Sequence, residues 1–215
     1  MLKKLTLILI IIIAAVTLFG CARTVTNVIT YGNSMSVIVT FRGNIDFFDN
    51  SYFMVISSQE AFQIPYDPYE PYEFIEPGLP PTDPTLDYYQ FYRTWDGYVI
   101  LDSSGSGLIW LVRGPFNSTA ESYADYTRVQ IGEVTTGSDQ WTFDFDLSQL
   151  YGTNVPVNIY FDFVSVSEST SRLQDHLDSN GQIQSYTDST ASDSNSPDTD
   201  IDASLDITRY SVTIN

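Results

Sequence analysis

The chain has 215 residues, of which 43% are hydrophobic and 14% aromatic, and this content is enough for one sizeable core. Its 27 acidic and 9 basic residues give a net charge of −18, which excludes nucleic acid as a partner because phosphates require a basic surface. The single cysteine excludes an internal disulfide framework and a zinc site built from cysteines.

Residues 1–20 have the features of an export signal. The chain starts with two lysines, Lys3 and Lys4, and continues with an uncharged apolar run that ends at Phe19. A run of this length is typical of the core of a signal peptide and is short for a membrane span. We therefore expect residues 1–20 to be a lipoprotein signal peptide that lies outside the folded domain.

The sequence "LFGC", from Leu18 to Cys21, resembles the bacterial lipobox, whose cysteine is acylated and becomes the mature N-terminus. The resemblance implies a lipidated N-terminus and short tether over residues 21–34. More than one acyl chain makes such an anchor stable, because each buried methylene contributes about 0.8 kcal/mol. Ala22 follows the cysteine, and the absence of aspartate there implies that delivery to an outer membrane is permitted. The alternative interpretation is an ordinary secretory signal or an uncleaved anchor, with Cys21 incidental.

Localisation and partners follow from these features. We expect a protein that is lipid-anchored at the cell membrane or outer membrane and faces the periplasm or the cell exterior. Removal of residues 1–20 removes both lysines and no acid, so the mature charge is 7 − 27 = −20. Such acidity favours cations, neutral ligands or basic partners, although it also serves simple solubility. It disfavours anionic lipid headgroups, so we expect the N-terminal lipid to make the membrane contact.

Segments rich in β-branched and aromatic residues, separated by turn residues, dominate the mature chain. In the longest of them, Ile159, Phe161 and Phe163 alternate with more polar positions, as in a strand with one face in a core. The pattern predicts an all-β fold, an antiparallel β-sandwich over residues 35–215, with one short helical stretch from Ser167 to Leu177. The nine expected strands lie at residues 35–42, 52–57, 86–95, 98–101, 108–114, 126–134, 140–147, 155–167 and 205–214.

The second half of the chain is similar to β-sandwich modules of the DOMON and carbohydrate-binding type. The similarity covers residues 140–214 and lies in the order of "WTFDFDLSQLYG", "VNIYFDFVSVS" and a closing "DASLDITRYSVTI". It implies the sandwich fold more than any ligand, because no haem-ligand pair of methionine and histidine can be matched. An immunoglobulin-like sandwich is the alternative architecture.

Two long loops interrupt the strand pattern. The first, residues 61–86, holds most of the ten prolines, too many for a strand with ladder hydrogen bonds. The second, residues 178–203, is polar and acidic. Loops of this length in compact domains are either functional or disordered. Strand-like sequence resumes after each of them, so we expect neither to be a domain boundary.

The first loop contains "PYDPYEPYE", three repeats of proline, tyrosine and an acid at residues 65–73. Proline at every third position matches polyproline II, which would place Tyr66, Tyr69 and Tyr72 along one edge about 9 Å apart. Together with Trp95, these rings form a candidate stacking surface for a glycan. The alternative, which we favour for at least one ring, is that the tyrosines pack over the sheet and shield it.

The acidic loop contains a candidate calcium site. Asp198, Asp200 and Asp202 supply oxygen ligands at short spacing, as calcium requires. The EF-hand pattern does not fit, because its sixth position would be Ala203 and its twelfth Arg209. A solvated loop without calcium is the alternative, and we expect no other cofactor.

Enzyme signatures are absent from the sequence. The lone histidine, His176, is expected in an exposed helical turn, and "SSGSG" at residues 103–107 is not a nucleophile elbow. Two carboxylates suffice for glycoside hydrolysis, so a hydrolase is the residual possibility. We expect a non-enzymatic, membrane-anchored binding module, with a glycan as the candidate ligand. The alternative is an envelope structural or assembly lipoprotein that contacts another protein.

Overall fold

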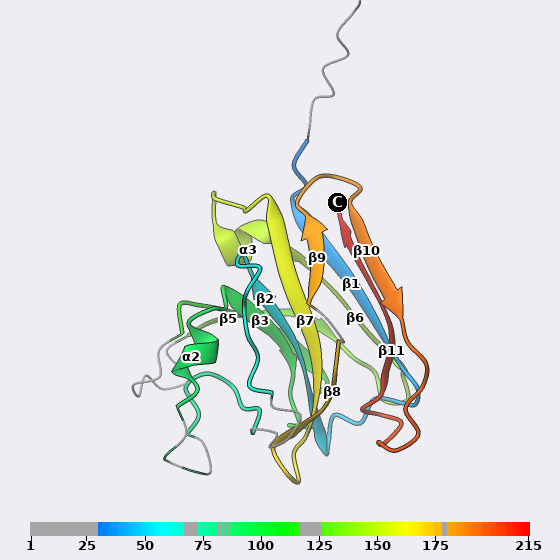
Figure 1. The fold of residues 1–215 in the computed structure, drawn as a ribbon. Helices are drawn as coiled ribbons and strands as arrows, with labels where there is room; N and C mark the ends of the chain where they lie inside the picture. The colour runs from blue at the N-terminus through cyan, green and yellow to red at the C-terminus, as the bar shows by residue number, and fades with distance from the viewer. Residues whose placement is uncertain are drawn as a thin grey trace, which may run out of the picture.

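The chain forms two antiparallel sheets that pack face to face (Figure 1). A computed structural model describes residues 30–66, 73–80, 83, 85, 87–116, 126–177 and 180–215. The four-stranded sheet has the order β10-β11-β1-β6, and the seven-stranded sheet has the order β5-β4-β3-β2-β7-β8, with β9 also paired to β7. The strands are β1 (Ser34–Phe41), β2 (Asn50–Ser57), β3 (Gly97–Leu101), β4 (Leu108–Arg113), β5 (Thr127–Glu133), β6 (Gln140–Asp146), β7 (Asn158–Ser167), β8 (Arg172–His176), β9 (Gly181–Gln184), β10 (Thr190–Ser194) and β11 (Ile207–Ile214). The predicted all-β antiparallel sandwich is therefore confirmed.

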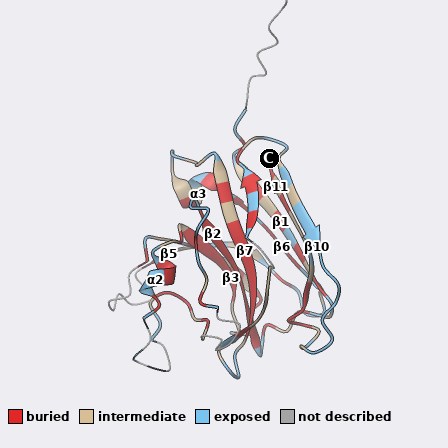
Figure 2. Cartoon of the chain, in the orientation of Figure 1, coloured by how far each residue is buried: buried red, intermediate tan, exposed pale blue. Residues whose placement is uncertain are grey.

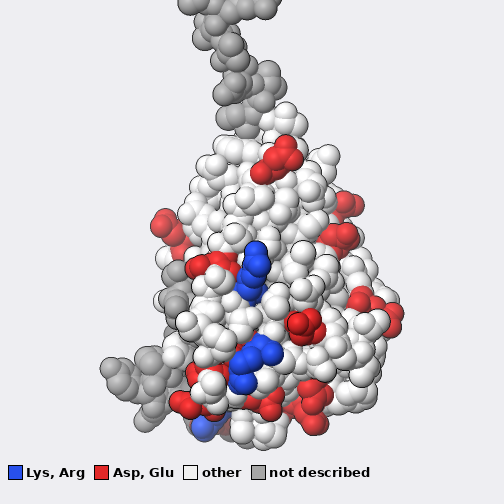
Figure 3. All heavy atoms as spheres, turned by 90° about the vertical axis from the view of Figure 1, so that its right-hand side faces the viewer, with Lys and Arg blue, Asp and Glu red and all other residues white. Residues whose placement is uncertain are grey.

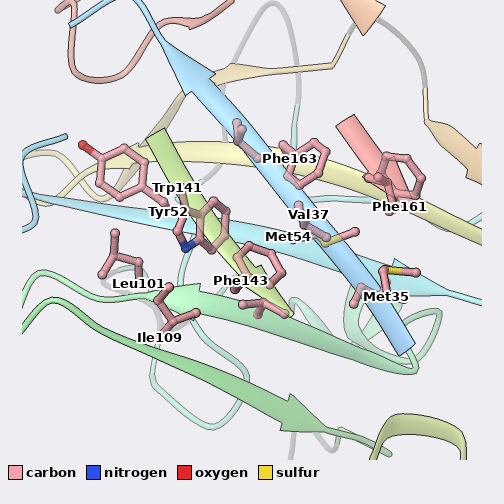
Figure 4. Close-up of a cluster of buried hydrophobic side chains, with 14 of the residues drawn as sticks. Met35, Val37, Tyr52, Met54, Leu101, Ile109, Trp141, Phe143, Phe161 and Phe163 are labelled. Carbon is pink, nitrogen blue, oxygen red and sulfur yellow. The ribbon is translucent and has the colours of Figure 1, made fainter. Parts of the chain in front are cut away.

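The main core lies between the two sheets. Alternate residues of β1 point inward from the four-stranded sheet, and Tyr52 and Met54 of β2 meet them from the other sheet (Figure 4). Trp141 of β6 is 1% exposed and its ring lies 4.8 Å from that of Phe143. In β7, Phe161 and Phe163 are buried in this core, as the alternation of the sequence predicts. Burial of each such side chain contributes about 1.5–3 kcal/mol, so this layer is a main source of stability.

A second core covers the outer face of the seven-stranded sheet. Strand β2 is buried along its whole length, because its outward residues Phe53 and Val55 pack under the proline-rich loop. Phe74 of this loop lies 4.8 Å from Phe53, and the cluster continues through Trp95 to Tyr98 of β3. In Figure 2, β2, β3 and β7 are largely red, whereas the edge strand β10 is largely pale blue. The described part of the first loop is therefore a packed cover of the sheet.

The segment at 86–95 is not a strand, which corrects the sequence prediction. It contains the short helix α2 (Tyr89–Tyr92), and the Asp87 carboxylate accepts a hydrogen bond from the Tyr89 backbone N–H at 2.9 Å. The residues that it buries, Tyr88, Phe91, Tyr92 and Trp95, recur at i, i+3, i+4 and i+7. That is the spacing of a helical face, and the aromatic content of the segment concealed it.

Three further strands lie where the sequence predicts helix or loop. Residues 172–176 form β8 instead of the end of a helix, because a turn with Ser171 at a positive φ of 53° folds the chain back onto β7. The acidic loop at 178–203 contains β9 and β10. Both are short and carry polar residues on their exposed faces, so they lack the apolar run that marks the inner strands. A second short helix in the described residues, α3 (Leu147–Tyr151), follows β6 directly.

The two ends of the sandwich differ in their loops. The described chain begins beside its C-terminus, where Met35 pairs with Ile214 (Figure 1). The turns that join β1 to β2, β3 to β4, β7 to β8 and β10 to β11 lie at the opposite end, which we call the distal end. No helix among the described residues is long and apolar enough to cross a membrane.

Candidate functional site

A cavity of about 200 Å³ lies near the distal end, on the outer face of the seven-stranded sheet. Its floor is apolar and comes from both the sheet and the proline-rich loop: Phe53, Phe74, Ile100 and Val166. Three carboxylates line its sides: Glu76, Asp102 and Glu168. We call this cavity the distal groove. An apolar floor with a few polar groups is the usual form of a ligand site.

The proline-rich loop positions Glu76 above the sheet through contacts on both sides. The Phe74 backbone N–H donates to the carbonyl of Ser171 at 2.7 Å, which ties the loop to the β7–β8 turn. The Tyr92 hydroxyl donates to the carbonyl of Ile75 at 2.9 Å, which ties it to α2. Glu76 is therefore held between two fixed elements, although it lies in a segment without regular structure.

Glu76 is the most strongly perturbed acid of the groove. The Tyr98 hydroxyl and an Arg128 guanidinium N–H each donate to its Oε2 at 2.9 Å. Only 7% of the residue is exposed, and this burial raises the pKa of Glu76 to about 7 despite the charge of Arg128. Arg128 itself lies 5.8 Å from the ring centre of Trp110. At neutral pH the carboxyl of Glu76 is therefore close to its midpoint of ionisation.

Glu168 and Asp102 reach the groove from two neighbouring turns. The Ser51 hydroxyl of β2 donates to Glu168 Oε1 at 2.5 Å, which orients that carboxylate over the sheet. Asp102 follows β3, and its Oδ1 accepts hydrogen bonds from the backbone and hydroxyl of Ser104. Both acids are more exposed than Glu76, so the groove has a buried acid at its inner end and two accessible acids at its sides.

A shallow hollow adjoins the groove at Glu168. It is lined by Phe48, Asp49, Asn50 and residues 167–169. Phe48 is 62% exposed, and its ring stacks on that of Phe47 with centres 5.3 Å apart. The ring also covers Gly105, where φ is +74° and a Cβ atom would lie 2.7 Å from Phe48. An exposed aromatic ring is thus held in a fixed position beside carboxylates and hydroxyls.

The predicted tyrosine surface is only partly within the described structure. Tyr66 is 41% exposed, and its ring centre lies 4.4 Å from that of His176. Tyr69 and Tyr72 lie outside the described residues. Trp95 is 4% exposed, and its indole N–H donates to the carbonyl of Gln63 at 2.7 Å. The prediction that Trp95 belongs to a stacking surface is therefore corrected: the ring is covered by the second core and presents no face to a ligand.

His176 lies in strand β8 and not in an exposed helical turn. Its Nδ1 is 3.4 Å from Oδ2 of Asp162, an acid that is 2% exposed on the neighbouring strand β7. The backbone N–H of Leu177 donates to the same carboxylate at 3.1 Å. His176 also borders a cavity of about 60 Å³ between β8 and β10–β11, which we call the side cleft. The imidazole of His176 contacts both Asp162 and Tyr66, so this histidine has a structural role in the fold.

The three aspartates of the candidate calcium site do not converge. Asp198 Oδ1 accepts from the backbone of Asp200, and Asp202 Oδ1 accepts from the backbone and hydroxyl of Ser204. Arg42, which follows β1, is a positively charged residue that contacts this loop. It donates to Asp206 Oδ2 at 2.6 Å and to the carbonyls of Asp198 and Ile201. Within the described part of the chain, no group of three metal-ligating side chains is found. The Arg42 guanidinium therefore holds this loop through Asp206 and two backbone carbonyls.

The acidity of the sequence is visible on the surface. Figure 3 shows the side of the molecule that carries β10 and β11, where acidic side chains are scattered over the whole face and basic ones are few. The groove follows the same bias, because the described residues that line it include three acids and no basic side chain.

Sequence reasoning missed the groove because its residues are far apart in the chain. Phe48, Glu76 and Glu168 come from three different loops that only the sandwich brings together. One local signal was present: Glu76 follows two apolar residues, Phe74 and Ile75, in a segment otherwise rich in proline. An acid beside residues that must be buried is a candidate for a perturbed pKa.

Comparison with known proteins gives no relative for this chain: no family model, curated protein or solved structure matches it. The candidate lipidation residue, Cys21, lies outside the described residues.

Proposed function

We propose that this protein is a lipid-anchored extracytoplasmic binding module whose distal groove and adjoining hollow take a glycan. The observation that carries the proposal is the position of Phe48 beside Glu168 and the groove. An exposed, fixed aromatic ring can stack on the apolar face of a sugar, while carboxylates and serine hydroxyls nearby accept and donate hydrogen bonds to its hydroxyls.

The proposed anchor and the groove are compatible in position. The signal-like residues 1–20 and the "LFGC" sequence support lipidation at Cys21. The described chain begins at the end of the sandwich that carries the C-terminus, and the groove lies near the distal end. A protein tethered through its N-terminus would therefore present the groove away from the membrane, toward the periplasm or the cell exterior. We propose that the protein binds the glycan and does not catalyse a reaction.

A glycan array tests the proposal. The full chain, solubilised in a detergent without sugar headgroups, should bind a subset of glycans, and Phe48→Ala should reduce that signal at least tenfold. Ile38→Ala is the matched control, because Ile38 is an exposed apolar residue (42% exposed) on the opposite sheet. Absence of any glycan signal, with stable capture of an envelope protein that depends on Phe48, would contradict the proposal and favour an assembly lipoprotein.

A further inference from the structure

We propose that the end of the sandwich at which the described chain begins docks on the headgroups of the bilayer that holds the lipid anchor. We call this end the proximal end and define it by residues 30–33, 152–157 and 185–189, which lie together opposite the distal end (Figure 1). The inference rests on the proposed anchor and goes beyond it, because a flexible tether alone leaves the orientation of the domain free.

Backbone hydrogen bonds join the three segments of the proximal end into one surface. Ser185 accepts a hydrogen bond from the Gly32 N–H at 3.0 Å and donates its own N–H to the carbonyl of Val157 at 2.9 Å. The Thr187 N–H donates to the carbonyl of Thr30 at 3.0 Å, so the chain is held from the first residue that the structure describes. The point at which the anchoring segment leaves the domain is therefore fixed.

Exposed aromatic and aliphatic side chains gather on this surface. Tyr31 is 51% exposed and Val157 is 42% exposed. The ring of Tyr186 meets that of Tyr31 edge-on with centres 5.4 Å apart, and the two backbones form a β-bridge. Tyrosine favours the headgroup level of a bilayer, because its hydroxyl stays hydrated while its ring leaves water. The proximal end thus presents the side chains that suit a lipid interface.

The charge of the proximal end also differs from that of the whole chain. Asp188 is the only charged residue in its three segments, whereas the chain has 27 acids. In Figure 3, the surface next to the grey trace is mostly white, and acidic side chains are more numerous toward the distal end. Repulsion between exposed charges and anionic headgroups is screened beyond about 10 Å. An acidic domain therefore approaches a bilayer most readily through this end.

The short segment that precedes the described chain keeps the proximal end close to the membrane. Residues 22–29 separate Cys21 from Thr30. Even a fully extended chain covers at most about 32 Å between these two residues. The segment carries Arg23 and no acid, so its charge suits a lipid surface. The bilayer is thus the large surface that the anchor brings to this end, and we assign it as the occupant in preference to a soluble partner.

Spin labelling of the full chain in phosphatidylcholine vesicles tests the docking. A nitroxide is attached to Val157→Cys, and the native thiol of Cys21 is blocked wherever it carries the lipid. Ile38→Cys is the matched control, because Ile38 is also a β-branched residue, is equally exposed at 42%, and lies on the outer face of the four-stranded sheet. Collision of the label with oxygen reports contact with lipid, and collision with a water-soluble nickel complex reports contact with water.

We expect the ratio of oxygen to nickel collisions to be at least threefold higher at position 157 than at position 38. Tyr31→Ser combined with Tyr186→Ser should abolish this difference, while the protein still floats with the vesicles and keeps its melting temperature. Both rings lie at the surface of the fold, so the double variant should remain folded.

Equal ratios at the two positions would overturn the inference, and flotation of the same sample would leave the proposed anchor standing. Spin–spin broadening at position 157 with a ratio typical of water would show that a second copy covers the proximal end, and this result also overturns the inference. Protein that does not float contradicts the anchor and the docking together. The glycan array decides the binding function separately from all of these outcomes.

Discussion

The Tyr98 hydroxyl of β3 donates a hydrogen bond of 2.9 Å to Oε2 of Glu76, an acid that belongs to the proline-rich loop. The contact joins the second core to the wall of the distal groove. Burial keeps the pKa of Tyr98 well above its ordinary value, so the hydroxyl remains a donor at any physiological pH. The same burial raises the pKa of Glu76.

The stability of the protein should therefore fall as the pH rises from 5 to 7.5. The folded-state pKa of Glu76 is about 7 against an ordinary value of 4.5, so the folded protein binds more protons than the unfolded chain between these values. Asp175 acts in the same direction, since burial raises its pKa to about 6. We expect the free energy of unfolding to decrease by on the order of 2 kcal/mol from Glu76 alone.

Urea denaturation at pH 5, 6, 7 and 7.5 measures this dependence, and Glu76→Gln should flatten it because the amide does not titrate. A free energy of unfolding that increases over the same interval would show that Glu76 ionises more easily in the folded protein than its burial implies.

The aromatic residues of the proline-rich loop should differ widely in their effect on stability. Phe74→Ala removes a ring that is 2% exposed in the second core and should destabilise the protein by about 3–5 kcal/mol. Tyr66→Ala removes a half-exposed ring that contacts His176 and should cost about 1 kcal/mol or less. Thermal melts of both variants, with Tyr69→Ala and Tyr72→Ala beside them, measure how much of "PYDPYEPYE" is packed. Equal melting temperatures for Phe74→Ala and the wild type would mean that the loop is not a cover of the sheet.

The sequence predicted the fold better than it predicted the site. Eight of the nine predicted strands match β1 to β7 and β11, and most of these strands place apolar residues in the main core, as β7 does with Phe161 and Phe163. The ninth predicted strand, residues 86–95, was wrong. This segment contains α2, where aromatic residues that favour strands lie at helical spacing. Strands β9 and β10 were missed because they are short and polar. The groove needs loops that are adjacent only after folding, and local patterns carry no information on that adjacency.

Arg42 should be the residue that holds the acidic loop in place. It pairs with Asp206, whose side chain is 1% exposed, so Arg42→Gln leaves a buried charge without its partner. Loss of one partner of such a pair costs about 3–5 kcal/mol, and we expect a decrease at the lower end because Arg42 is partly exposed. Arg93→Gln, at an exposed arginine, is the control.

Addition of calcium tests the other hypothesis for the acidic loop. Because Asp198, Asp200 and Asp202 do not converge, addition of 1 mM calcium should leave the melting temperature of the wild type unchanged. A rise of several degrees that disappears in Asp200→Asn would restore the calcium hypothesis for this loop.

Cys21→Ser should abolish lipid attachment. The hydroxyl of serine cannot form the thioether that lipidation at a lipobox cysteine requires, so the variant should accumulate as precursor or be released from the membrane. Metabolic labelling with a palmitate analogue measures the attachment directly, with the wild type labelled in parallel. Equal label in the variant and the wild type would exclude Cys21 as the anchor.

The most direct test of a ligand site at the distal end is to map a bound glycan by NMR. A glycan that binds in the array is titrated into the isotope-labelled protein, and the backbone amide shifts are followed. We predict that the largest changes occur at residues 48–51, 74–76, 102–103, 166–169 and 171, which line the groove and its hollow. Changes confined to the side cleft at residues 193–195 and 207–210, or to the outer face of the four-stranded sheet, would contradict the assignment of the groove as the binding site.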